Sequence, residues 1–184
     1  MITQPQEVIA TIHDYQDLTR ALAYPSVRTL FIMNGDLMSL ATTIATIQAV
    51  DRRVLLHVDF IQGLATDAKG IQYVAQVLKP DGIITTRSQV VQLARKNRLF
   101  TIQRLFLIDS NALRAGIKNL RHSQPDAVEV MPGLIPRVIR ELKQSLELPV
   151  IAGGLIQQRE EVQAAFDAGA DAVSLSGFHC WYEK

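Results

Sequence analysis

The sequence contains one cysteine, few aromatic residues and no long hydrophobic run. Cys180 is the single cysteine among 184 residues, which excludes an internal disulfide and a cluster of thiolate metal ligands. Hydrophobic residues make up 48% of the chain. Even so, no uninterrupted run reaches the roughly 18 residues that a membrane-spanning helix needs, and the N-terminus lacks a basic segment followed by an apolar one. We therefore expect one cytoplasmic domain, residues 1–184, without a membrane partner.

The chain also lacks an overall excess of charge, because the formal net charge is only +1. The charges are nevertheless unevenly placed. Residues 87–122 contain eight basic and one acidic side chain, against six and eight in residues 1–86 and five and nine in residues 123–184. The low net charge disfavours a dedicated nucleic-acid-binding protein, whereas the cationic segment at residues 87–122 favours a local contact with a polyanion.

Three similar segments recur at a fixed spacing. They are KPDGIITTR from Lys79, QPDAVEVMPG from Gln124 and GADAVSLSG from Gly169. Their aspartates, Asp81, Asp126 and Asp171, stand 45 residues apart, which indicates internal repetition. Between them lie the apolar runs RVLLHVDF, RLFTIQRL and LPVIAGGL, which are short and bounded by turn formers and therefore favour strands.

Strands and helices are expected to alternate along the whole chain. The predicted strands begin near residues 8, 28, 54, 82, 99, 127, 150 and 172, and stretches of good helix formers lie between them. This pattern predicts an α/β fold, a small (β/α)8 TIM barrel with minimal loops. Such barrels usually have about 250 residues, so the last helix would only begin at residues 181–184. A doubly wound open sheet is the alternative.

Strand alternation predicts which side chains enter the barrel lumen. Leu56, Val58 and Phe60 are expected to face the helices, which turns His57 and Asp59 inward. The same reasoning on the other strands places Arg104 at the position equivalent to Asp59. It gives the expected polar group at the mouth: His57, Asp59, Arg104, Glu129, Ser174 and Ser176. Buried charges are costly unless they meet each other or a ligand. A binding site at the mouth is favoured over the alternative, a structural ion pair between Asp59 and Arg104.

Glycines at the ends of the last predicted strands favour an anion site. Gly153 and Gly154 follow the seventh strand, Ser176 and Gly177 follow the eighth, and Gly133 follows the sixth. Backbone amides that glycine exposes near a helix start can hold a phosphate, and the last two loops are the usual phosphate site of this fold. The alternative is that these glycines only form tight turns.

Catalytic machinery is sparse. No lysine stands at a predicted strand end for Schiff-base chemistry, and the carboxylates Asp59, Asp67 and Glu129 lack the clustered spacing of a metal site. His57 with Asp59 would serve as a base and its orienting group, although a histidine bound to a ligand hydroxyl fits equally well. We therefore predict no catalytic residue, metal or cofactor. The alternatives are a small lyase or isomerase for a three-carbon phosphate and a metabolite sensor that acts on another protein.

The basic segment predicts a cationic surface on two neighbouring helices. Arg114, Lys118 and Arg121 are spaced by four and three residues and share one helix face. The candidate RNA-binding residues are these three with Arg95, Lys96 and Arg98. Phe100 and Phe106 are interpreted as strand core, so any RNA contact would use the phosphate backbone. A merely solvated helix face is the alternative.

Seven motifs resemble a known family. They are FIMNGD at Phe31, HVDFIQG at His57, KPDGIITTRS at Lys79, IQRLFLID at Ile102, EVMPG at Glu129, IAGG at Ile151 and GADAVSLS at Gly169. In this order they are similar to the glycerol-3-phosphate-responsive antiterminators of the glycerol uptake regulon. One departure is the run SLSGFHCWYEK after the eighth strand, which alters the expected phosphate loop.

The resemblance implies a regulator that binds glycerol-3-phosphate and leader mRNA and so prevents transcription termination. It implies the ligand-binding residues His57, Asp59, Gln62, Gly63, Arg87, Gln103, Arg104, Glu129, Gly133, Gly153 and Gly154, to which the expected phosphate loop adds Ser176 and Gly177. We expect the phosphate near Gly153, Gly154 and Ser176 and the glycerol hydroxyls near Asp59 or Glu129. The oligomeric state is left open, with a homo-oligomer among the alternatives.

Overall fold

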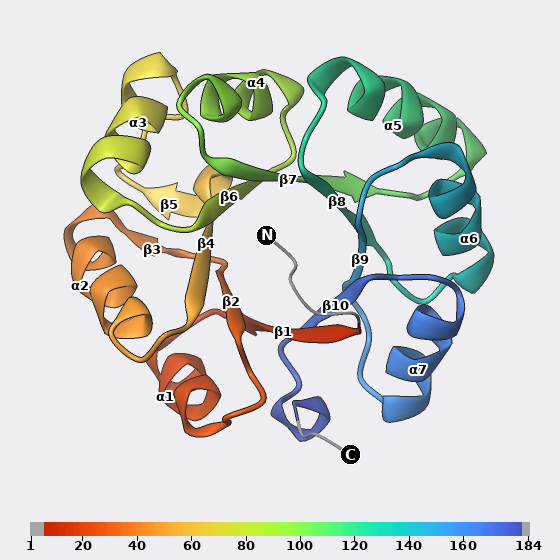
Figure 1. The fold of residues 1–184 in the computed structure, drawn as a ribbon, viewed down its shortest axis with the longest axis horizontal. Coiled ribbons are helices and arrows are strands. Elements are labelled where there is room, and N and C mark those ends of the chain that lie inside the picture. The colour runs from red at the N-terminus through yellow and green to blue at the C-terminus, as the bar shows by residue number, and fades with distance from the viewer. Residues whose placement is uncertain (1–5, 182–184) are drawn as a thin grey trace.

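The computed structural model describes residues 6–181, which form a closed barrel of eight parallel strands (Figure 1). The barrel strands are β1 (Glu7–Ile12), β2 (Thr29–Ile32), β4 (Arg53–His57), β6 (Gly82–Thr85), β7 (Phe100–Phe106), β8 (Ala127–Met131), β9 (Val150–Gly153) and β10 (Ala172–Leu175). Strands that follow one another along the chain are neighbours in the barrel, and β10 pairs with β1 to close it. The predicted barrel is confirmed, each strand begins within one residue of its predicted position, and the open-sheet alternative is wrong.

Helices return along the outside of the barrel after most strands. They are α1 (Tyr15–Ala23), α2 (Leu37–Gln48), α3 (Ala68–Tyr73), α4 (Ser88–Lys96), α5 (Ser110–Ser123), α6 (Pro136–Ser145) and α7 (Arg159–Asp167). A π-helical turn, Val74–Leu78, continues α3. A short parallel pair, β3 (Gly35–Asp36) with β5 (Ile61–Gln62), lies beyond the ends of β2 and β4.

Aspartates begin four of the helices. The carboxylates of Asp14, Asp36, Asp67 and Asp109 accept backbone N–H groups in the first turns of α1, α2, α3 and α5. Such caps satisfy amides that the first helical turn leaves without a partner. Because each helix runs back against its strand, these caps lie at the carboxyl ends of the strands, which we call the mouth.

The place of an eighth helix is taken by a short turn and a tryptophan. After β10 the described chain forms a 3-10 turn, Phe178–Cys180, which lies between α1 and α7 (Figure 1). Trp181 is only 1% exposed, donates from Nε1 to the Leu175 carbonyl at 3.3 Å and meets the Tyr24 ring edge-on. One large ring therefore covers this side of the barrel. Of the predicted helix start, residues 182–184 lie outside the described residues.

The aspartates of the 45-residue repeat each link two neighbouring strands by hydrogen bonds, and we call these links anchors. Asp81 precedes β6, and its carboxylate accepts the Val54 amide of β4 at 2.9 Å. Asp126 binds the Thr101 amide at 2.8 Å in the same way, and Asp171 binds the Val150 amide at 2.7 Å. In all three pairs the aspartate amide also donates back, at 2.8–3.0 Å, to the carbonyl of the residue whose amide it binds. Each anchor fixes the register of one strand pair at the end of the barrel opposite the mouth.

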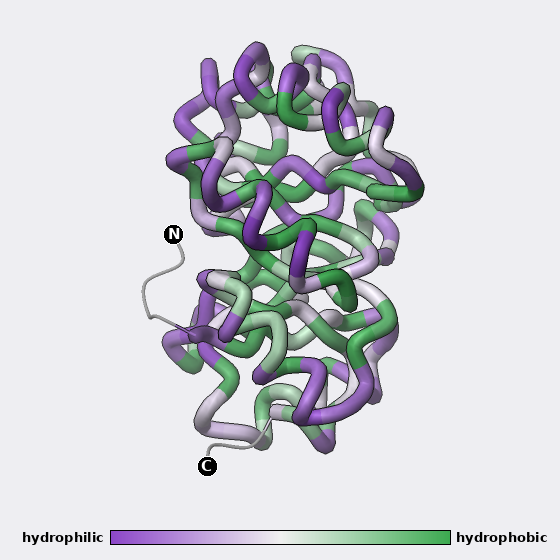
Figure 2. Tube along the Cα trace, turned by 90° about the vertical axis from the view of Figure 1, so that its right-hand side faces the viewer, coloured by the Kyte–Doolittle hydropathy of each residue, from purple (hydrophilic) through white to green (hydrophobic). Residues whose placement is uncertain are grey.

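Two apolar layers fill the molecule. One lies between the barrel and the helices and includes Leu56, Val58, Val128 and Val130. The other fills the lumen with Ile9, Phe31, Leu55, Ile84, Ile102, Ala127, Ile151 and Ala172, and with Met33 toward the mouth. Figure 2 shows hydrophobic segments running through the middle of the molecule and hydrophilic segments mainly in its outer turns. The inner layer makes the barrel a packed core whose polar groups are confined to its two ends.

The end opposite the mouth is closed by an ion pair. The Arg53 guanidinium lies 2.6 Å from the Glu7 carboxylate, which also accepts the Thr29 hydroxyl. Glu7 and Thr29 are buried. Pairing offsets the cost of removing the carboxylate from water, so this charge is balanced within the barrel.

We expect Asp126→Ala to lower the free energy of unfolding by about 1–3 kcal/mol, because hydrogen bonds from the Thr101 amide and hydroxyl to a charged acceptor are lost. Glu147→Ala removes a carboxylate from an exposed residue and should change it by less than about 0.5 kcal/mol. Urea denaturation of both variants and the wild type measures the difference. Equal stability of the two variants would contradict the anchor role.

Candidate functional site

A small pocket opens at the mouth of the barrel. Its volume is about 230 Å³, and its lining comes from the carboxyl ends of β1, β2, β7, β8, β9 and β10. The lining residues are Thr11, His13, Met33, Arg104, Met131, Gly154, Leu155, Ile156, Ser174, Leu175 and Ser176. We call this cavity the mouth pocket. Arg104, Gly154 and Ser176 were predicted site residues, and the structure brings them together here.

A buried ion pair supports the floor of the mouth pocket. Arg104 on β7 donates from Nε to Glu129 Oε2 on β8 at 2.6 Å, and Ser174 on β10 donates to Glu129 Oε1 at 2.5 Å. All three side chains are at most 4% exposed. Glu129 therefore has a partner on each oxygen and holds Arg104 in place, while Arg104 is also a lining residue of the pocket.

The anchored repeat explains which polar side chains share a level in the lumen. Three residues after the anchored amides of Val54, Thr101 and Val150 stand His57, Arg104 and Gly153. The sequence analysis placed Arg104 level with Asp59, and that alignment is wrong. Arg104 is equivalent to His57, and the space that a side chain at Gly153 would take on β9 is occupied by Ser174 and Glu129.

Two glycines are required by close packing. A Cβ on Gly153 would overlap the Ser174 hydroxyl and lie 2.7 Å from Glu129 Oε1, so only glycine fits beside this pair. Gly133 donates its amide to the Gly153 carbonyl at 2.6 Å, and a Cβ there would lie 2.8 Å from the Gly153 amide nitrogen. Gly154 has φ of +73°, which glycine adopts at little cost. The glycines therefore shape the pocket wall.

A second polar cluster forms where β4 and β6 end, away from the lining of the mouth pocket. Asp59 accepts bonds from the Thr85 hydroxyl, the Thr86 amide and hydroxyl, and the Arg87 guanidinium at 2.8–3.1 Å. Burial alone would raise the pKa of Asp59, but these hydrogen bonds lower it below the usual value. The alternative of an Asp59–Arg104 ion pair is wrong, because Asp59 pairs with Arg87 and Arg104 pairs with Glu129.

The strand alternation used in the sequence analysis fails after His57. β4 ends there, and Val58–Phe60 forms a 3-10 turn that redirects the following side chains. Leu56 and Val58 pack toward the helices as predicted. Phe60 does not, because it is 52% exposed and stacks on the His57 ring with centroids 4.3 Å apart.

His57 is enclosed in the upper lumen without a hydrogen-bond partner. The residue is 0% exposed, and neither Nδ1 nor Nε2 has a partner. The predicted use of Asp59 to orient His57 is therefore absent, since Asp59 is held by Thr85, Thr86 and Arg87. Burial, followed by the positive charge of Arg104, lowers the pKa of His57 from 6.5 to about 4, although Asp59 acts in the opposite direction.

Other predicted ligand residues lie apart from the mouth pocket. Gln103 faces the helices, donating to the Ser88 hydroxyl and accepting from the Ser123 hydroxyl, because it alternates with the lumen residue Arg104. Gln62 belongs to β5, and Gly63 follows it, both exposed. Gly177 directly follows the lining residue Ser176 but is not part of the lining. The part of these four residues and of Asp59 and Arg87 in ligand binding stays a prediction.

The sequence analysis missed the pocket residues that the first two strands contribute. Thr11 and His13 come from β1 and the residue just beyond it, and Met33 follows β2. The spacing of Ile9, Thr11 and His13 could have predicted them. Side chains two residues apart on a strand face the same side, and Ile9 is a lumen residue, so Thr11 faces the lumen as well. The first two strands were predicted, but the orientation of their side chains was not assigned.

Exposed apolar side chains surround the mouth. They are Tyr15, Met38, Phe60, Phe106, Ile108, Leu134, Leu155 and Phe178, each at or shortly after the end of a barrel strand. Phe106 was predicted to be strand core, yet it is 55% exposed. That prediction was wrong because Phe106 is the last residue of β7 and lies beyond the packed part of the barrel.

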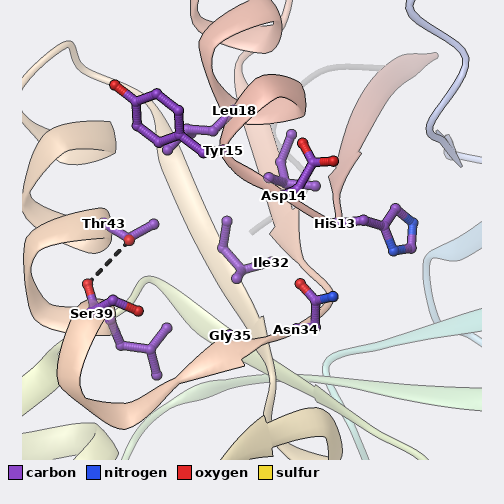
Figure 3. Close-up of a pocket in the computed structure, with 11 residues that line it drawn as sticks. His13, Asp14, Tyr15, Leu18, Ile32, Asn34, Gly35, Ser39 and Thr43 are labelled. Atoms are coloured by element: carbon purple, nitrogen blue, oxygen red, sulfur yellow. Dashed lines mark hydrogen bonds between the residues drawn. The ribbon is translucent and has the colours of Figure 1, made fainter.

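A second cavity of about 260 Å³ lies between α1 and α2 beside the mouth. Tyr15 and Leu18 of α1 and Ser39 and Thr43 of α2 line its sides, with Ile32 of β2 between them (Figure 3). The Thr43 hydroxyl donates to the Ser39 carbonyl at 3.1 Å. His13 lines both this cavity and the mouth pocket, so the two spaces share one wall residue.

The six predicted RNA-binding side chains are all exposed on α4, α5 and the turn after α4. Arg114 stands near the mouth end of α5 and Arg121 near its other end, so this basic face follows the length of the helix. Arg95 donates to the Gln124 side chain at 3.2 Å, and Arg121 to the Ser145 carbonyl at 3.3 Å. These two arginines border a groove of about 660 Å³ at the end opposite the mouth.

Neither a metal-ligand group nor a membrane-spanning helix is present in residues 6–181. Within residues 6–181, no three or more His, Cys, Asp or Glu side chains are grouped so that they would hold a metal ion. Asp59, Asp67 and Glu129 are engaged separately, by Arg87, by the first turn of α3 and by Arg104. None of the helices in the described part of the chain is long and apolar enough to cross a membrane.

We expect the stability of the protein to fall as the pH decreases from about 6.5 toward about 4, because His57 stays neutral when folded and takes up a proton when unfolded. His57→Phe removes this proton uptake, so the variant should lose less stability than the wild type over the same pH range. Urea denaturation near pH 7.5 and near pH 5 measures the difference. An identical pH dependence in both proteins would contradict the buried neutral state.

The chain is similar to several known proteins over nearly its full length. A solved glycerol uptake operon antiterminator regulatory protein from Listeria monocytogenes is 35% identical, covers 96% of this chain and 95% of its own, and has a TM-score of 0.91. A glycerol uptake operon antiterminator-related protein from Thermotoga maritima is 27% identical with a TM-score of 0.86, covering 97% and 99%. The uncharacterized protein YgcP of Escherichia coli is 29% identical over 95% of this chain and 91% of its own.

The match to a family model agrees with these similarities. The model described as glycerol-3-phosphate responsive antiterminator matches residues 8–181, which begin in β1 and end at Trp181. The resemblance seen in the motifs is thereby confirmed. This chain belongs to the glycerol-3-phosphate responsive antiterminator family.

Proposed function

We propose that this protein binds glycerol-3-phosphate in the mouth pocket and, when occupied, binds nascent leader mRNA through the basic face of α4 and α5 and prevents termination. The observation that carries this proposal is the mouth pocket, where a buried arginine meets the loops after β9 and β10. These loops are the usual phosphate site of the fold. Family membership supports the choice of glycerol-3-phosphate as ligand and of antitermination as outcome.

The pocket chemistry suits a small organic phosphate. Arg104 offers a charged donor, and Ser174 and Ser176 bring hydroxyl groups to the same cavity. Gly154 brings the backbone close without a Cβ in the way. In the proposed pose the phosphate lies between Arg104, Gly154 and Ser176, and the carbon chain points down into the lumen.

The pocket lining lacks the amine that a Schiff-base aldolase needs, and His13 is its one imidazole among the described lining residues. Among the described residues that line it there is no lysine, and Glu129 is held by Arg104 and Ser174. A Schiff base requires an amine at the substrate carbonyl, and a general base requires a free acceptor near the proton it removes. The missing lysine supports a binding protein over the alternative of a Schiff-base lyase.

The basic face suits a nucleic-acid backbone. Its six cationic side chains lie on adjacent helices and are accompanied in residues 87–122 by a single acid, Asp109, which caps α5 at the mouth. Each phosphate contact adds salt-sensitive affinity. β7 carries Arg104 and leads directly into α5, which gives ligand occupancy a short structural route to this face. A homo-oligomer stays a prediction.

We expect calorimetry to show saturable binding of glycerol-3-phosphate to the wild type and at least about 10-fold weaker binding to Arg104→Met with Glu129→Gln, because a charge-assisted hydrogen bond is lost. The double variant avoids leaving Glu129 charged and unpaired. Arg87→Met with Asp59→Asn removes the equivalent pair at the β4–β6 side and should bind within about 3-fold of wild type if the anion lies in the mouth pocket. A larger loss in this second double variant would contradict the pocket assignment.

Reversing three charges on α5 should weaken RNA binding. We expect Arg114→Glu, Lys118→Glu and Arg121→Glu together to lower the affinity for the leader RNA of a glycerol uptake gene, and to reduce the slope of log affinity against log salt by roughly 0.7–0.9 per lost contact. The control, Arg20→Glu with Arg28→Glu and Lys69→Glu, makes the same change in net charge at exposed sites away from α4 and α5. Fluorescence anisotropy with and without glycerol-3-phosphate measures both. Equal losses in the two triple variants would contradict the assigned face.

A further inference from the structure

His57 is a buried polar group whose hydrogen-bonding capacity is unused. The residue has no exposed surface, and both of its ring nitrogens lack a partner. A buried polar atom without a hydrogen bond destabilises the fold, so such atoms usually serve a bound molecule or an ordered water. His57 does not itself line the mouth pocket, but it occupies the position on β4 that is equivalent to the pocket residue Arg104 on β7, so the two side chains lie at the same level of the lumen.

Arg104, in the same part of the lumen, also has hydrogen-bonding capacity that is poorly satisfied. Its Nη2 meets the Met33 sulfur at 3.6 Å, and thioether sulfur is a weak acceptor. Met33 directly follows β2, and His57 is the last residue of β4. The two strands pair with Ile32 beside Leu56, so Met33 and His57 are the next residues on each strand and both enter the lumen. An oxygen-rich ligand would give Arg104 a stronger acceptor than Met33, and displacement of the Met33 thioether would bring the rest of the ligand toward His57.

We propose that His57 recognises the hydroxyl groups of the ligand, so that it selects a polyol phosphate over a phosphate with an apolar tail. This inference rests on the proposed ligand-binding function and assigns the specificity of that site. The phosphate stays with Arg104 and the glycine loops, and the hydroxyl-bearing carbons extend from Arg104 to His57. The contact between Arg104 and Met33 opens to admit them.

The state of His57 suits a hydroxyl partner. Buried and neutral, the imidazole has one N–H donor and one acceptor nitrogen, which match the acceptor and donor of an alcohol. A doubly ionised phosphate has acceptor oxygens and no donor. The guanidinium of Arg104, which only donates, is therefore better suited to it than the imidazole. Phe60 stacks on the ring with planes 21° apart and holds it in one orientation. A fixed ring that both donates and accepts discriminates against a ligand that lacks hydroxyls.

Two ligands of equal length separate hydroxyl recognition from phosphate recognition. Glycerol-3-phosphate and n-propyl phosphate share the phosphate and the three carbons, but only the first has hydroxyls. For the wild type we expect calorimetry to show at least about 10-fold tighter binding of glycerol-3-phosphate. His57→Phe keeps an aromatic ring for Phe60 and should lower that affinity about 10-fold or more while leaving n-propyl phosphate within about 3-fold.

Two controls make the outcome decisive. His57→Gln restores a donor and an acceptor and should recover part of the preference for glycerol-3-phosphate. Nitrogen-15 NMR of the histidines in the wild type should show a shift of the His57 ring signals with glycerol-3-phosphate and a smaller shift with n-propyl phosphate, which tests the contact even if a variant fails to fold. Unchanged preference in folded His57→Phe, or equal shifts with both ligands, would overturn the inference. Absence of binding of either ligand to the wild type would instead contradict the proposed function.

Discussion

The mouth of this barrel depends on one buried ion pair. Arg104 on β7 and Glu129 on β8 lie side by side in the register of the two strands and meet at 2.6 Å with almost no exposure to solvent. Each charge alone would be too costly to bury, and together they are tolerated because Ser174 satisfies the second carboxylate oxygen. The requirement that Gly153 has no Cβ follows directly, since the pair and its serine occupy that space.

The repeat of aspartate anchors gives this ion pair its position. Asp126 fixes the start of β7 against β8, and Arg104 and Glu129 both stand three residues beyond that junction. The equivalent positions on the other anchored pairs hold His57 with Ile84 and Gly153 with Ser174. The same backbone frame therefore presents different side chains around one mouth. The charged pair is Arg104 with Glu129, the side chain without a hydrogen-bond partner is His57, and Gly153 has no side chain.

The molecule separates its two candidate surfaces by chemistry. The mouth carries a ring of exposed apolar side chains and the carboxylate caps of four helices, whereas the exposed side of α4 and α5 is basic. Polyanions are disfavoured near carboxylates and favoured near the basic face. β7 joins the two surfaces, because it contributes Arg104 to one and continues through Phe106 and Ile108 into the helix that carries the other.

The sequence alone determined the barrel, the starts of its strands and the position of the basic helices. These follow from local patterns, namely the alternation of strands and helices, the 45-residue spacing of the aspartates and the four-and-three spacing on α5. The motifs also indicated the family. Even the inward positions of Glu129 and Ser174 followed from the period of two along each strand.

Only the tertiary structure decided which charges meet. When the strand alternation was extended past the end of β4, it placed Asp59 in the lumen with Arg104. In the structure the 3-10 turn at Val58–Phe60 redirects Asp59, which bonds to Thr85 and Arg87 instead. It also took the structure to show that Gln103 faces the helices and that His57 has no partner. The physical reason is that hydrogen bonds between strands depend on register and barrel stagger, which are set by contacts far apart in the chain.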